Sequence, residues 1–178
     1  MSHKDIHIRA VSADDVEALA HVGIMANEGA FRGIVPDVCL EFTEAQSATN
    51  WRKTFVEEGL PSGNEFLVVA ETLEGEVVGY VWGGVKDDGD GIVRVLMVLP
   101  AYHKRGIGRR LVYHVAERLA EKGIHRMTVE VLAVNPNRYF YERIGATFVS
   151  ESPYDWDGVL LASCLYQWAD TQTLLSHP

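Results

Sequence analysis

Apolar residues recur with two different periods along the chain, and the change of period separates helices from strands. A short extended run at Ile6–Ala10 is followed by two stretches with helical spacing. Each helical stretch begins with a hydroxyl residue that precedes an acid or amide by three positions, Ser12 before Asp15 and Thr43 before Gln46. Such a capping box satisfies free N–H groups at a helix start. The pattern therefore predicts a strand and two helices ahead of the main sheet.

β-branched and aromatic residues dominate the middle of the chain. Three such runs, Phe66–Thr72, Val77–Val85 and Ile92–Leu99, are joined by short glycine-containing turns. Short connections of this kind predict three consecutive antiparallel strands. The pair Gly83 and Gly84 inside the second run predicts a bulge or a close backbone approach.

The remaining elements alternate between helix and strand. They are predicted in the order helix Gly108–Lys122, strand Met127–Val134, helix from Asn135 to Gly145, strand Thr147–Glu151, a loop, strand Val159–Trp168 and a loose tail. The length of 178 residues suits one domain. We expect a single α/β domain over 1–178, with a core at 6–168 and a tail at 169–178. Its mixed, mostly antiparallel sheet has about seven strands, with helices on both faces.

Charge is distributed unevenly. The net charge of −9 argues against nucleic acid and anionic membranes as partners. Residues 102–126, however, hold seven of the 16 Lys and Arg residues and two acids, a local charge of +5. Such a basic segment in an acidic chain indicates a phosphate-bearing ligand, the alternative being a solvated helix face with Arg–Glu pairs.

The cysteines and the apolar runs bear on location. Cys39 and Cys164 lie far apart in sequence among apolar residues, which predicts buried reduced thiols rather than a disulfide or zinc site. The sequence has neither a signal-peptide pattern nor an uninterrupted apolar run of about 18 residues. We therefore expect a cytoplasmic protein. The histidines also lack the spacing of metal ligands, so we expect no metal.

A glycine-rich turn connects the strand that ends at Pro100 to the helix that follows. Strand, glycine-rich turn and helix together form an anion site, because the first N–H groups of a helix converge on one point. Gly108 is followed by Arg109 and Arg110, so the Lys-Ser/Thr of a nucleotide-triphosphate loop is absent. Leu111 stands where a dinucleotide fingerprint needs its third glycine.

Two segments resemble the GNAT superfamily of N-acetyltransferases. Leu96–Pro100 followed by His103–Gly108 resembles its acyl-CoA-binding motif, Arg/Gln-x-x-Gly-x-Gly/Ala after a strand, with His103 where Arg or Gln is usual. Asn135–Ala146 resembles the family's Asn and Phe-Tyr-Glu-Arg-x-Gly segment. The resemblance covers 65–168 well, and Phe31–Asp37 is a weaker match.

The resemblance implies acetyl-CoA as co-substrate and a set of residues that hold it. These are Met97 and Val98 along the pantetheine arm, His103, Lys104, Arg105, Gly106, Ile107, Gly108, Arg109 and Arg110 around the pyrophosphate, and Asn135 and Arg138 on the arm and the phosphates. Backbone amides would do most of this work, so the substitution at His103 affects only a side-chain contact.

Acid–base chemistry is assigned to three residues. Tyr141 matches the family tyrosine that protonates the CoA thiolate, and general acid help contributes about 10²- to 10⁴-fold. Packing in the core is its alternative role. No carboxylate occurs between Ile92 and Leu99, so Glu130, between two valines in a strand, is the first candidate for the base. Glu28 is the second candidate. Two alternatives remain open: a water chain that deprotonates the amine, and a structural ion pair as the role of Glu130.

The acceptor pocket follows from the family layout. It is expected to draw on Glu28, Phe31, Arg32, Asp37, Trp82, Tyr154 and Trp156. The acidic and aromatic side chains in this set suit an ammonium group. We expect an N-acetyltransferase that acts on a small-molecule or peptide primary amine by direct attack in a ternary complex. The alternatives are a non-catalytic acyl-CoA sensor and a transferase of a larger acyl group. The acceptor, the acyl-chain length and a possible homodimer through edge strands stay open.

Overall fold

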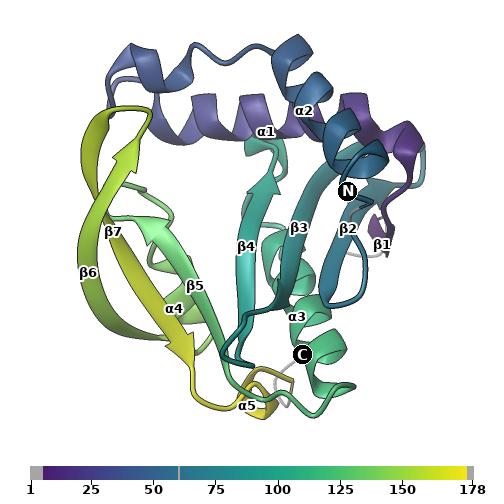
Figure 1. Ribbon diagram of the computed structural model, residues 1–178, viewed down its shortest axis with the longest axis vertical. Coiled ribbons are helices and arrows are strands. Elements are labelled where there is room, and N and C mark those ends of the chain that lie inside the picture. The colour runs from purple at the N-terminus through teal and green to yellow at the C-terminus, as the bar shows by residue number, and fades with distance from the viewer. Residues whose placement is uncertain (1–5, 60, 176–178) are drawn as a thin grey trace.

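The computed structural model describes residues 6–59 and 61–175, which form a seven-stranded sheet with helices on both faces (Figure 1). The strand order is β1-β2-β3-β4-β5-β7-β6, and every neighbouring pair is antiparallel except β4 and β5. The strands are β1 Ile6–Ala10, β2 Glu65–Thr72, β3 Val77–Val85, β4 Gly91–Val98, β5 Met127–Leu132, β6 Thr147–Trp156 and β7 Val159–Trp168. The predicted fold class is confirmed.

The helices divide between the two faces of the sheet. They are α1 Val16–Phe31, α2 Glu44–Val56, α3 Ile107–Ala120, α4 Phe140–Arg143 and α5 Gln172–Leu175, with 3-10 turns η2 Ala13–Asp15, η3 Asp37–Leu40 and η4 Pro100–Tyr102. Trp51 of α2 contacts Tyr80 and Trp82 on one face of β3, with ring centroids 5.7 and 5.8 Å apart. Gly83, on the other face, leaves no room for a Cβ, which would lie 2.5 Å from Val115 of α3.

Both predicted capping boxes are present. The backbone N–H of Gln46 donates to Thr43 Oγ1, and the backbone N–H of Thr43 donates to Gln46 Oε1 at 2.8 Å. At the first helix the Ser12 N–H donates to Asp15 Oδ2 at 2.7 Å. The Thr43 box caps α2, and the Ser12 box caps the 3-10 turn η2, which leads directly into α1.

The glycine pair of β3 marks a bulge, as predicted, but the extra residue lies on the neighbouring strand. Trp82 pairs with Val95 and Gly83 pairs with Val93, so Arg94 of β4 has no partner across the ladder. A bulge bends a strand and increases its local twist. The bulge at Arg94 lies where β4 separates from β5, because β4 and β5 pair only from Gly91 to Val93.

Three predicted boundaries are wrong. The helix predicted from Asn135 begins only at Phe140, because Asn135 Oδ1 accepts from the Asn137 N–H at 2.8 Å and forms a turn that competes with helix. The strand predicted to stop at Glu151 continues to Trp156, beyond which Asp157 and Gly158, at φ 50° and 88°, close a tight hairpin.

The third correction concerns the predicted loose tail. Residues 172–175 form α5, and Leu174 is buried in the main core. Residues 176–178 lie outside the described residues. Cys39 and Cys164 are free and buried, as predicted. In the described part of the chain no helix has both the length and the apolarity needed to cross a membrane.

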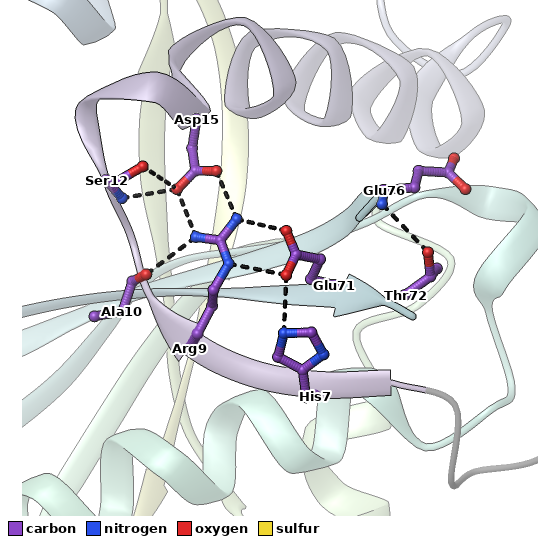
Figure 2. Close-up of polar contacts among 8 residues, drawn as sticks. All are labelled: His7, Arg9, Ala10, Ser12, Asp15, Glu71, Thr72 and Glu76. Atoms are coloured by element: carbon purple, nitrogen blue, oxygen red, sulfur yellow. Dashed lines mark hydrogen bonds and ion pairs between the residues drawn. The ribbon is translucent and has the colours of Figure 1, made fainter. Parts of the chain in front are cut away.

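A charged network ties the edge strand β1 to the rest of the domain (Figure 2). Arg9 donates to both oxygens of Asp15 at 2.8 Å and to both oxygens of Glu71 at 2.7 and 3.0 Å. His7 contacts the same Glu71 carboxylate at 2.8 Å, and Ser12 donates to Asp15. Hydrogen bonding to Arg9 lowers the pKa of both carboxyls. One guanidinium therefore joins β1, β2 and the start of α1.

We predict that Arg9→Met lowers the free energy of unfolding at pH 7 by about 1–3 kcal/mol, the size of a hydrogen-bonded charge contact. Because the folded-state pKa values of Asp15 and Glu71 are lowered, their contribution is present above the unfolded values of about 4 and is lost as the pH falls through the folded ones. The difference between wild type and variant should shrink below about pH 4 in urea titrations. Arg118→Met, which breaks the exposed pair with Glu121, is the control, and an equal loss in both variants would contradict the prediction.

Candidate active site

A cleft of about 670 Å³ opens where β4 and β5 separate. The volume is within the usual range of small-molecule sites, about 300–1,000 Å³. Its walls come from α1, β4, the loop between η4 and α3, the start of α3, β5, α4 and β6. Figure 1 shows β4 and β5 diverging toward α1, which crosses the open end of the split.

The N-terminus of α3 forms one end of the cleft. Gly106, at φ 75°, is the N-cap, and Lys104 before it also has a positive φ of 59°. The Arg110 N–H donates to Gly106 O, so the amides of Ile107, Gly108 and Arg109 precede the first helical hydrogen bond. The helix has 14 residues, long enough for its dipole to favour an anion at this end.

Most of the residues predicted to hold the cofactor line this cleft. They are Met97, Val98, His103, Lys104, Gly106, Ile107, Gly108, Arg109 and Asn135. The His103 ring is tied to the end of β4, with Nε2 3.0 Å from Val98 O. The Nε atom of Arg109 is buried and has no hydrogen-bond partner among the described residues.

Three predicted cofactor residues are not among those that line the cleft. Arg105 donates to Ala101 O at 3.0 Å and lies over the Tyr102 ring. Arg110 donates to the Ile6 carbonyl of β1 at 2.9 Å. Arg138 donates to Cys164 Sγ and to Tyr139 Oη. Each guanidinium is engaged by a local structural contact, which the spacing of basic residues did not reveal.

Tyr141 lines the cleft and is also part of the core. Its ring stacks on Tyr166 at 6.1 Å and meets Phe140 and Trp168 edge-on at 5.1 and 6.3 Å. Burial raises the pKa of the Tyr141 phenol, so the group keeps its proton at neutral pH. Within 6–59 and 61–175 no residue hydrogen bonds to its hydroxyl. The packing fixes the ring and leaves the O–H group available.

Glu130 lines the cleft from β5, on the face of the sheet opposite to Tyr141. Its neighbour Val129 pairs with Tyr166, on which Tyr141 stacks, whereas Glu130 pairs with Leu165 on the other face. The buried Ser163 hydroxyl of β7 donates to Glu130 Oε1. This hydrogen bond holds the carboxylate from the β7 side of β5.

The acceptor residues predicted from the family layout divide into two groups. Phe31, Tyr154 and Trp156 line the cleft, with Phe31 and Trp156 packed edge-on at 5.6 Å. Glu28, Arg32, Asp37 and Trp82 are absent from its walls.

Internal contacts explain this absence. Arg32 donates to Glu28 Oε2 and to Asp37 Oδ1 at 2.8 Å each, so both acids are paired at the end of α1. Trp82 packs on Trp51 and donates to Glu65. Glu28 and Asp37, predicted to form an acidic acceptor surface, are therefore ion-paired with Arg32 and do not line the cleft.

The cleft also contains charged residues that the sequence analysis missed. Arg94 and Arg143 line it from β4 and α4. Arg94 was detectable as a lone charge inside an apolar strand, and Arg143 as part of the Phe-Tyr-Glu-Arg segment. No group of three His, Cys, Asp or Glu side chains in the described ranges is arranged to hold a metal ion.

Comparisons with known proteins agree with this geometry. Residues 34–146 match the acetyltransferase (GNAT) family. The chain is 24% identical over 173 residues to an uncharacterized N-acetyltransferase, YuaI, of Bacillus subtilis, covering 95% of this chain and 96% of that one.

Two solved structures share the fold. The PaiA N-acetyltransferase of Thermoplasma acidophilum in complex with coenzyme A has a TM-score of 0.67 at 18% identity, covering 92% of this chain and 99% of that one. YncA of Salmonella typhimurium, a putative acetyltransferase with its cofactor acetyl-CoA, has a TM-score of 0.65 at 20% identity, covering 92% and 93%.

Proposed function

The chain belongs to the acetyltransferase (GNAT) family, and from this premise we propose that it transfers an acetyl group from acetyl-CoA to a primary amine. The observation that carries the proposal is the cleft through the split sheet. It has an anion-binding helix terminus and a protonated phenol on one face, and an oriented carboxylate on the other. Structures of the same fold with coenzyme A or acetyl-CoA support the choice of co-substrate.

The residues at the start of α3 fit a pyrophosphate. The amides of Ile107, Gly108 and Arg109 would donate to its oxygens, and the side chains of Lys104 and Arg143 would neutralise its charge. Met97, Val98 and Asn135 would then contact the pantetheine arm along the split. Acetyl-CoA supplies the activated thioester, so the protein needs no covalent acyl-enzyme.

The proposed reaction uses a carboxylate and a phenol on opposite faces of the sheet. Glu130 takes a proton from the substrate ammonium, and the resulting amine attacks the thioester carbon. As the new C–N bond forms and the C–S bond breaks, Tyr141 gives its proton to the departing sulfur. The amide nitrogen loses its second proton, Tyr141 is reprotonated, and the products are the N-acetyl compound, CoA and one released proton.

Calorimetry with acetyl-CoA followed by a thiol-release assay with primary amines tests the proposal. Micromolar binding and amine-dependent release of free thiol are expected. Binding without release from any amine would favour a non-catalytic acyl-CoA sensor. Absence of binding would refute the cofactor site at the start of α3.

Gly108→Glu should abolish CoA binding, because it places bulk and negative charge at the helix terminus that receives the phosphates. Gly108→Ala is the matched control. Its Cβ would lie 3.4 Å from Phe140, an ordinary contact, so CoA affinity should change by less than about threefold. Calorimetry measures both, and normal affinity in Gly108→Glu would refute the pyrophosphate site.

Tyr141→Phe should lower kcat by about tenfold or more with little change in the Kd for CoA, because only the proton donor is removed. The control is Tyr139→Phe, since Tyr139 is half exposed and its hydroxyl receives a hydrogen bond from Arg138. Unchanged turnover in Tyr141→Phe would remove this residue from the mechanism.

Glu130→Gln should lower kcat/KM by about 10²-fold near neutral pH, and the loss should diminish at high pH, where the free amine forms without a base. Glu151→Gln, on the exposed strand β6, is the control. A pH-independent loss of the same size in Glu130→Gln would indicate a structural role.

A further inference from the structure

Two charged residues of opposite sign occupy the two sides of the split on the face that carries α1 and α2. The last residues paired between β4 and β5 are Val93 and Val129, so the next position on each strand is Arg94 and Glu130. Both side chains line the cleft. The Arg94 guanidinium lies on this face because it binds Glu65, which also accepts a hydrogen bond from Trp82.

We propose that the acceptor is an α-amino acid with an apolar or aromatic side chain, its ammonium group at Glu130 and its carboxylate at Arg94. The inference rests on the proposed acetyl transfer and specifies the amine. An α-amino acid carries its two charges within a few atoms of each other. Arg94 and Glu130 directly follow the last paired residues of β4 and β5, so a ligand in the opening of the split lies between the two charged side chains.

Arg94 retains donors for a carboxylate. Its Nε and Nη2 bind the Glu65 carboxylate at 2.8–3.2 Å. Among the described residues nothing accepts from Nη1, whose two N–H groups remain for a ligand. Glu65 is itself held by the Trp82 indole N–H, so the guanidinium is positioned before a ligand arrives. Charge-assisted bonds from arginine to carboxylate are among the stronger polar contacts in proteins.

Glu130 is the one carboxylate among the residues that line the cleft in the described part of the chain. A polyamine, with several cations spaced along an alkyl chain, would leave all but one of them without an acid. Glu28 and Asp37, the other acids near this end of α1, are already paired with Arg32. No ion pair between Arg94 and Glu130 is present within 6–59 and 61–175, so each remains a separate anchor.

The side-chain end of the pocket is apolar. Phe31, Leu132, Tyr154 and Trp156 line the cleft beyond Glu130. Leu132 lies two residues after Glu130 on β5 and therefore projects from the same face. Aromatic and aliphatic walls of this kind favour an apolar side chain, because they bury hydrocarbon surface and offer few hydrogen bonds.

Comparison of matched amines on the wild-type protein tests the inference without any variant. Phenylalanine, methionine and leucine are compared at saturating acetyl-CoA with phenylalaninamide, phenethylamine and spermidine, and thiol release is measured. We expect kcat/KM for phenylalanine to exceed that of phenethylamine and phenylalaninamide by about tenfold or more, since these lack the carboxylate. Spermidine should be a poor acceptor.

Arg94→Gln assigns the preference to one residue. It should lower kcat/KM for phenylalanine by about tenfold and change that for phenethylamine by less than about threefold, which a general structural defect would not do. Arg126→Gln is the control, because Arg126 is exposed and also faces an acid, Asp90. Calorimetric CoA affinity verifies that Arg94→Gln is folded.

The outcomes separate the two proposals. Equal or faster acetylation of phenethylamine, phenylalaninamide or spermidine would overturn the amino-acid inference and leave acetyl transfer standing. Thiol release from none of the amines, with CoA bound normally, would refute acetyl transfer to amines and the inference with it. An equal loss for both substrates in Arg94→Gln would show that Arg94 does not read the carboxylate.

Discussion

The separation of β4 from β5 after Val93 and Val129 is the constraint on which the rest of the site depends. Inside a sheet, strands normally satisfy each other's backbone groups, and unpaired buried N–H and C=O groups are costly. Here two central strands end their pairing early and leave such groups facing a cleft. A ligand with amide and carbonyl groups along its length would satisfy them. The bulge at Arg94 lies at the start of the split, and a bulge bends the strand that contains it.

The split also gives the protein two chemically different faces. On the face of α3 and α4, the helix terminus with Lys104, Arg109 and Arg143 forms a positive region that suits phosphates in a chain of net charge −9. On the face of α1 and α2, the Glu130 carboxylate, the Arg94 guanidinium and a group of aromatic side chains surround the opening. In the proposed reaction, two ligands approach one point from opposite sides of the sheet, as direct transfer in a ternary complex requires.

Many charged residues near the cleft are engaged by hydrogen bonds or ion pairs within the protein. Arg105, Arg110 and Arg138 are basic residues beside the cleft whose guanidinium groups contact local backbone or side-chain acceptors. Glu28 and Asp37 form ion pairs with Arg32. A local excess of charge in the sequence thus overstates the number of side chains that reach a ligand.

The sequence alone determined the order of the elements, both capping boxes, the fold class and the two motifs that line the cleft, because caps, periodicity and glycine-rich turns act over a few neighbouring residues. It also led to two candidates for acid–base chemistry, Tyr141 through the resemblance to the acetyltransferase family and Glu130 as a carboxylate between two valines in a strand. Tertiary structure decided where β6 ends and placed Arg94 opposite Glu130. It also decided the contacts of Arg32 and Trp82 and those of Arg105, Arg110 and Arg138. Those depend on register between strands and on contacts between residues far apart in the chain, which no local pattern specifies.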